Sequence, residues 1–103
     1  MNPQEKVEEF MNENGFGGSK EYAILDLASE VGEIAADATK SAEWGREPQN
    51  LEVKEDELGD VMFSLLALAN ELDMDAFKAL NTAMEKYERR IEETGDPSSR
   101  SIS

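Results

Sequence analysis

The chain has 103 residues, 24 of them acidic and 10 basic, so its formal net charge is −14 at neutral pH, and it contains no cysteine or histidine. The absence of these two residue types excludes disulfides, thiol nucleophiles, Ser-His-Asp triads and metal sites built on imidazole or thiolate. Any metal must be bound through oxygen, which favours Mg²⁺, Mn²⁺ or Ca²⁺, while the negative charge disfavours binding to nucleic acid polymers and anionic membranes.

The length corresponds to one small domain, and short helical domains often gain hydrophobic core by self-association. No run of 18 apolar residues could span a membrane, and the first ten residues lack the basic and apolar regions of a signal peptide. We therefore expect a cytoplasmic protein that makes no membrane contact.

The first two predicted elements are helices. Asn2 followed by Pro3 is typical of a helix start, and the stretch from Gln4 to Asn12 places its apolar residues on one face before the glycine-rich segment 14–18 ends it. Ser19 is a favourable N-cap for a second helix from about Lys20 to Ala42. Apolar residues recur along this helix at steps of three and four, forming one stripe: Ile24, Leu27, Ala28, Val31, Ile34, Ala35 and Ala38.

The next two predicted elements are also helices. A third runs from about Glu52 to Leu72, and because Ser64 is the only polar residue between positions 61 and 69, this helix should be the most buried. Asp75 is the expected N-cap of a fourth helix that continues to about Glu93. Its apolar stripe consists of Phe77, Leu80, Met84, Tyr87 and Ile91.

No alternating pattern typical of a strand occurs, so the sequence predicts an all-α protein. Four helices with short connections favour a four-helix bundle-like domain over residues 1–94, its core completed by homo-oligomerisation. Residues 95–103 are expected to form a flexible C-terminal tail.

The second and third helices carry the same short pattern of acid, apolar residue, glycine, acid and apolar residue, at Glu30–Ile34 and at Glu57–Val61. In each pattern the two acids are three residues apart and share one helix face. Acids at this spacing can simply form a solvated surface. On the second helix such a surface is plausible, because its acids form a stripe well away from the apolar one: Asp26, Glu30, Glu33 and Asp37.

Three features favour a metal site instead. Like charges at this spacing are destabilising unless a cation neutralises them. Gly32 and Gly59, each placed between two acids, cost about 1 kcal/mol relative to alanine, and they would allow two helix backbones to approach closely. Glu57 and Asp60 also begin the most apolar helix, where unpaired carboxylates are costly. A divalent cation shared by the four carboxylates would account for all three features.

Mg²⁺ is commonly bound through a few carboxylates together with substrate phosphates, so this set of acids suggests hydrolysis of a phosphoric anhydride. The general base would be a carboxylate or a water activated by the metal. The segment 14–18 lacks the lysine and hydroxyl residue of a P-loop and is interpreted as an ordinary connecting loop.

The segment Leu27–Ala35, followed by Glu57–Val61, resembles the MazG-like all-α nucleoside triphosphate pyrophosphohydrolases, whose signature is ExxE and then ExxD on adjacent helices. The resemblance covers roughly residues 20–92. It implies cleavage of a (deoxy)nucleoside triphosphate to the monophosphate and pyrophosphate, as in the house-cleaning of nucleotide pools. It also implies a homo-oligomer, a dimer or a tetramer, and a Mg²⁺ cofactor that Mn²⁺ can replace. The implied metal ligands, of which the first two are also the expected catalytic residues, are Glu30, Glu33, Glu57 and Asp60.

The chain departs from this family at two places. Ser29 stands where many relatives have a further glutamate, and on the last helix only Lys86 remains of their polar pattern. Lys86, Arg90 and Lys54 are candidates for binding phosphate, although Lys86 and Arg90 would also suit the C-terminal end of a helix and nearby glutamates. Trp44 is a candidate for stacking on the base, and packing at a subunit interface is the alternative.

Three other functions compete with this interpretation. The substrate could be a modified or metabolite-linked nucleotide such as phosphoribosyl-ATP. The chain could also be a non-catalytic helical interaction or regulatory module that keeps the acidic cluster. A di-iron carboxylate bundle is disfavoured because such bundles use Glu-x-x-His motifs and the chain has no histidine.

Overall fold

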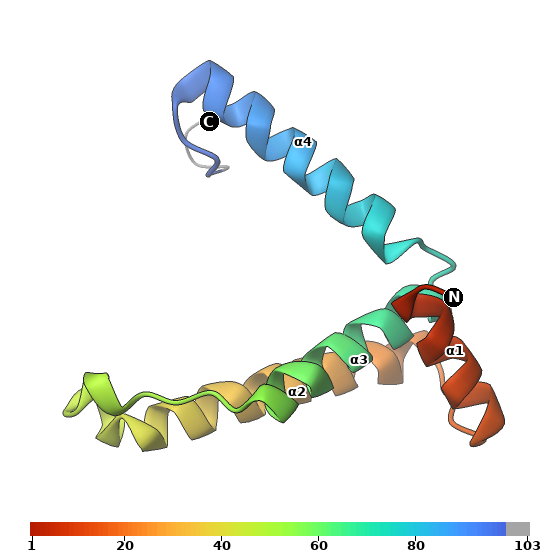
Figure 1. The fold of residues 1–103 in the computed structure, drawn as a ribbon, viewed down its shortest axis with the longest axis horizontal. Coiled ribbons are helices and arrows are strands. Elements are labelled where there is room, and N and C mark those ends of the chain that lie inside the picture. Colours follow the sequence, from red (N-terminus) through yellow and green to blue (C-terminus); the bar gives the residue numbers. More distant parts are fainter. Residues whose placement is uncertain (99–103) are drawn as a thin grey trace. The chain divides into compact units, whose positions relative to one another are not determined.

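The computed structural model describes residues 1–98 and consists of helices and turns (Figure 1). The four α-helices are α1 (Pro3–Glu13), α2 (Lys20–Ser41), α3 (Glu55–Glu71) and α4 (Ala76–Thr94). Two short 3-10 turns, η1 (Glu43–Gly45) and η2 (Pro48–Asn50), connect α2 to α3. No strand occurs among the described residues, and the predicted all-α class is confirmed. None of the helices in this part of the chain has both the length and the apolar character of a membrane span.

The chain divides into two compact units. The first, Met1–Asp73, contains α1, α2 and α3, and the second, Met74–Ser103, contains α4. A single domain over residues 1–94 stays a prediction. Of the predicted tail, residues 95–98 form a turn in which the Ser98 N–H donates to the Asp96 carboxylate at 2.8 Å, and residues 99–103 lie outside the described residues.

Three of the helix starts are set by the local caps that the sequence predicts. The Asn2 side chain accepts a hydrogen bond from the Glu5 N–H at 2.8 Å, and the Ser19 hydroxyl accepts one from the Tyr22 N–H at 3.2 Å. The Asp75 carboxylate accepts from the first turn of α4 at 3.0 and 3.1 Å. Each cap satisfies amide groups that have no partner within their own helix, which is why α1, α2 and α4 begin where expected.

The third helix begins three residues later than predicted, at Glu55 instead of Glu52. The backbone N–H of Glu52 donates to the Ser41 hydroxyl at the end of α2, at 2.8 Å. This long-range bond holds the segment before α3 outside the helix and ties it to α2. Such a bond depends on the tertiary fold, so helical periodicity carries no signal for it.

Within the first unit, α2 and α3 lie side by side and run in opposite directions (Figure 1). Their contact surface, here called the α2–α3 seam, follows a helical repeat. On α2 its least exposed residues are Ala23, Leu27, Glu30, Ile34, Ala38 and Ser41. On α3 the buried residues are Ser64, Leu66, Ala67 and Ala69, so the prediction that this helix is the most buried is confirmed. Half of these α2 residues are small, namely Ala23, Ala38 and Ser41, and Glu30 is the one charged residue among the six.

The two glycines between the acids do not mark a close approach of the helices, and that part of the sequence interpretation is wrong. A Cβ atom built on Gly32 or on Gly59 meets no atom within 4 Å. Gly32 is two residues from Glu30, a rotation of about 200° around the helix, so it faces away from the seam. The structure gives no packing reason for glycine at either position.

The first helix is held to α3 by one aromatic contact and one pair of hydrogen bonds. Phe10 meets Phe63 edge to face, with ring centroids 5.8 Å apart. The Gln4 side-chain amide donates to the Asn70 side-chain oxygen at 2.9 Å, and the Asn70 amide donates to the Gln4 backbone carbonyl at 3.2 Å. Because these groups are partly buried, the pair fixes where α1 lies along α3.

Replacing Asn70 by alanine should therefore loosen α1. We expect Asn70→Ala to lower the free energy of unfolding by about 1–2 kcal/mol in urea denaturation, because both hydrogen bonds are lost. Asn81→Ala, the same change at an exposed position of α4, is the control and should change stability by less than about 0.5 kcal/mol. Equal effects of the two substitutions would contradict the role given to Asn70.

Candidate active site

Carboxylates of the two sequence patterns act on one another across the α2–α3 seam. The pKa of Glu30 is raised above its ordinary value of 4.5, first by partial burial and then by the negative charges of Glu33 and Asp60, with a smaller contribution from Asp26. Glu33 and Asp26 lie on the same helix as Glu30, but Asp60 belongs to α3. The structure therefore brings Glu30 of the first pattern close to Asp60 of the second.

The other carboxylate of the second pattern has a similar environment. The pKa of Glu57 is raised by partial burial and by the Asp37 side chain of α2, and the backbone N–H and charge of Lys54 oppose this rise. The Lys54 N–H donates to Glu57 Oε1 at 3.4 Å, whereas Glu57 Oε2 is buried without a hydrogen-bond partner. A buried carboxylate oxygen without a partner is costly, and a cation would relieve that cost.

Three residues near the acid pairs were not assigned to the site from the sequence. The hydroxyl of Ser64 on α3 donates to Asp26 Oδ2 at 2.8 Å, and Asp37 is the α2 neighbour of Glu57. Both ends of the acidic stripe of α2 thus interact with residues of α3, although Asp26, Glu33 and Asp37 are exposed, so the choice between a solvated surface and a metal site stays open. The sequence did contain a signal for these three residues. Asp26 lies one helical turn before Glu30, Asp37 lies one turn after Glu33, and Ser64 lies one turn after Asp60.

The proposed metal ligands fit a divalent cation in three respects. All four bind metals through oxygen, and Glu57 has a buried Oε2 atom without a hydrogen-bond partner. Partial burial and nearby carboxylates raise the pKa of Glu30 and of Glu57, and a cation would lower both pKa values again. Among residues 1–98, no group of three or more acidic side chains is gathered closely enough to hold a metal ion. Metal binding by Glu30, Glu33, Glu57 and Asp60 therefore stays a prediction.

Two of the predicted substrate-binding residues belong to the first unit. Lys54 is the N-cap residue of α3, and its charge acts directly on Glu57. Trp44 lies in η1, just beyond the end of α2, with a left-handed φ of 59° and 66% of its surface exposed. An exposed indole is suited to stacking, so its contact with a base stays a prediction.

The other two predicted substrate-binding residues, Lys86 and Arg90, lie on α4 in the second unit. Both approach the ring of Tyr87, with Lys86 Nζ 5.4 Å and Arg90 Cζ 6.0 Å from its centroid. Arg90 Nη1 also donates to the Pro97 carbonyl at 3.3 Å and so braces the turn after α4. Phosphate binding by these two cations stays a prediction.

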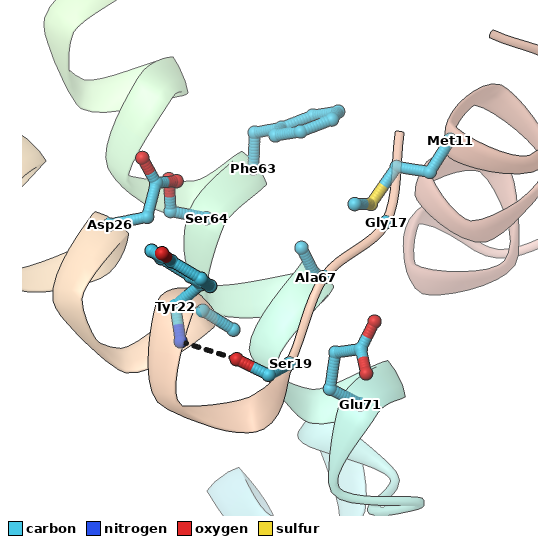
Figure 2. Close-up of a pocket in the computed structure, with 11 residues that line it drawn as sticks. Met11, Gly17, Ser19, Tyr22, Asp26, Phe63, Ser64, Ala67 and Glu71 are labelled. Atoms are coloured by element: carbon cyan, nitrogen blue, oxygen red, sulfur yellow. Dashed lines mark hydrogen bonds between the residues drawn. The ribbon is translucent and has the colours of Figure 1, made fainter. Parts of the chain in front are cut away.

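A cavity of about 270 Å³ lies at the Asp26 end of the acid pairs (Figure 2). Its walls come from α1, the glycine-rich loop, the start of α2 and the second half of α3. Asp26 and Ser64 lie next to each other on one wall, and Met11 belongs to another. No sequence signal pointed to this cavity, because it forms only where these four segments meet.

The crowding of negative charge around Glu30 should lower the free energy of unfolding of the metal-free protein, and this effect can be measured. Because the folded state holds the Glu30 proton more tightly than the unfolded state, ionisation of Glu30 destabilises the fold once the pH exceeds its raised pKa. We therefore expect Glu30→Gln to raise the free energy of unfolding at pH 7 in the presence of a chelator. Near pH 4, where the wild-type carboxyl is largely protonated, this gain should disappear.

Glu8→Gln, the same change at an exposed position of α1, controls for the general loss of one negative charge. A gain at pH 7 that is as large in Glu8→Gln as in Glu30→Gln would contradict the crowding of charge at the seam.

A family model described as the MazG nucleotide pyrophosphohydrolase domain matches residues 19–94. No curated protein and no solved structure matches the chain. The matched residues begin at the N-cap of α2, contain both acid pairs and end with α4. The match confirms the resemblance carried by the ExxE and ExxD patterns, and the chain belongs to the MazG nucleotide pyrophosphohydrolase family.

Proposed function

We propose that the protein is a Mg²⁺-dependent pyrophosphohydrolase that converts a (deoxy)nucleoside triphosphate into the nucleoside monophosphate and pyrophosphate. The observation that carries this proposal is the proximity of carboxylates from two antiparallel helices, Glu30 to Asp60 and Glu57 to Asp37. Membership of the MazG family supports nucleotide pyrophosphohydrolase activity in general. The charge of the site supports the metal dependence, because the substrate is itself a polyanion.

In this proposal Glu30, Glu33, Glu57 and Asp60 hold the cation. When bound, Mg²⁺ offsets the negative charge of the phosphates and stabilises the charge that develops during phosphoryl transfer. Lys54, whose charge acts on Glu57, attracts the phosphates in this proposal. Lys86 and Arg90 supply further phosphate contacts, and Trp44 stacks on the substrate.

Hydrolysis needs a proton acceptor for the attacking water, and Glu30 and Glu33 are the proposed catalytic pair. The water oxygen bonds to a phosphorus atom beside the oxygen that bridges the α and β phosphates, and the P–O bond to that bridging oxygen breaks. The proton leaves the water for a carboxylate.

The activity is tested by measuring release of pyrophosphate from a panel of nucleoside triphosphates with and without Mg²⁺. We expect release that requires Mg²⁺ or Mn²⁺, and a loss of about a hundredfold or more in Glu33→Gln and Asp60→Asn, because each substitution removes a carboxylate from the site. Glu8→Gln should keep full activity. Release of orthophosphate alone would contradict the proposal, and Mg²⁺ binding without any hydrolysis would favour the non-catalytic module.

We also propose that the protein is a homo-oligomer, because its large apolar side chains are poorly covered. Leu66 is the only buried residue larger than alanine among the apolar residues that the structure describes. Leu58, Met62 and Leu65 of α3 are between 46% and 55% exposed, and Ile24 and Val31 of α2 are half exposed. Leu80, Met84 and Ile91 of α4 are likewise about half exposed. Soluble monomers rarely expose so much apolar surface, and a second copy of the chain would cover it.

Light scattering after gel filtration tests this assembly. We expect a molar mass at least twice the 11.5 kDa of one chain. Met62→Glu should shift the protein toward the monomer, because a charge would be buried in the subunit interface, whereas Glu8→Gln should not. A wild-type protein that is folded and monomeric at micromolar concentration would contradict the proposed oligomer.

A further inference from the structure

The cavity beside Asp26 has the size of a subsite for one flat ring. At about 270 Å³ it is smaller than pockets that take drug-sized ligands, which begin at about 300 Å³. Its walls include the side chains of Tyr22 and Phe63 as well as those of Met11 and Ala67. Aromatic and apolar walls of this kind are suited to stacking on a nucleobase.

One residue in the wall of the cavity also acts on the acid pairs. Asp26 lines the cavity, and it is also one of the carboxylates that raise the pKa of Glu30. Glu30 follows Asp26 by four positions, which is about 6 Å along the helix axis and a length that a ribose can bridge. A nucleotide with its phosphates at the acid pairs can therefore place its base in the cavity.

The polar groups of the cavity define which base edge it accepts. Ser64 is only 4% exposed, and its hydroxyl proton is already donated to Asp26 Oδ2 at 2.8 Å. This bond holds the Asp26 carboxylate in one orientation. Asp26 and Glu71, the two charged side chains on the walls, are carboxylates that only accept hydrogen bonds when ionised.

A carboxylate pairs best with two donors that lie side by side. Guanine presents such an edge, with its N1–H next to its 2-amino group. Adenine and cytosine present one amino group beside an acceptor nitrogen, and uracil and thymine present one N–H between two carbonyls. If an acceptor faces the carboxylate, the interaction is repulsive, so these four bases match the cavity less well.

We propose, on the basis of the proposed function, that this cavity binds the base of the substrate and that Asp26 selects guanine through its N1–H and 2-amino group. Ser64 is the positioning residue that fixes the Asp26 carboxylate. Tyr22 and Phe63 provide the stacking surfaces. The substrate class is therefore guanine nucleoside triphosphates.

The sharpest test compares dGTP with dITP, which differ only in the 2-amino group. We expect kcat/KM for pyrophosphate release to be about tenfold to a hundredfold higher for dGTP, the effect of one hydrogen bond to a charged acceptor. In Asp26→Asn the ratio of the two kcat/KM values should fall to about one, because the amide can donate as well as accept. Ser64→Ala should lower the ratio less.

Glu21→Gln removes one negative charge from the first turn of the same helix, outside the cavity, and should keep the wild-type ratio. Pyrophosphate release with equal kcat/KM for dGTP and dITP would overturn the guanine pocket and leave the proposed function intact. A preference that persists in Asp26→Asn would also overturn it.

Binding of the monophosphates tests the pocket without any hydrolysis. We expect dGMP to bind wild-type protein at least tenfold more tightly than dIMP and to shift the amide resonances of Tyr22 and Ala67 in nuclear magnetic resonance spectra. If no triphosphate is hydrolysed, the proposed function fails, and this measurement still decides the pocket. Equal affinity for dGMP and dIMP, or shifts confined to residues outside the cavity, would overturn the proposal.

Discussion

Negative charge crowded along the α2–α3 seam is the constraint on which the rest of the structure depends. Glu30 and Glu57 are held partly out of water beside other carboxylates, and Glu57 Oε2 has no hydrogen-bond partner. Partial burial and like charge make this arrangement costly in the absence of a cation. The cost becomes understandable if a cation and the phosphates it binds belong in the seam.

The other residues of the first unit hold the carboxylates of α2 and α3 near one another. Small side chains such as Ala23, Ala38 and Ala67 let the two helices pack closely enough for acids of one helix to act on acids of the other. The hydrogen bond from Ser64 fixes one end of the acidic stripe, and the bond from the Glu52 N–H to Ser41 ties the other end of α2 to the segment before α3. The first unit buries little apolar surface, so several of its leucines and methionines stay exposed.

The sequence predicts those parts of this structure that depend on local chemistry. Ser19 and Asp75 cap the helices that follow them, and the spacing of Glu30 with Glu33 already places both acids on one face. Features that depend on how two helices meet could not be predicted. The pairing of Asp26 with Ser64 and the late start of α3 both depend on contacts between α2 and residues that are far from it in sequence. The cavity forms only where four segments of the chain meet, so no single stretch of sequence predicts it.

The central claim is that the two acid pairs form one cation site, and paramagnetic broadening by Mn²⁺ tests it most directly. Nuclear magnetic resonance spectra of the ¹⁵N-labelled protein would be recorded while Mn²⁺ is added at substoichiometric concentration. The account predicts that amide signals near Glu30 and Glu33 on α2 and near Glu57 and Asp60 on α3 broaden together at the lowest concentrations. Broadening spread evenly over exposed acids such as those of α1, or confined to one of the two helices, would contradict it.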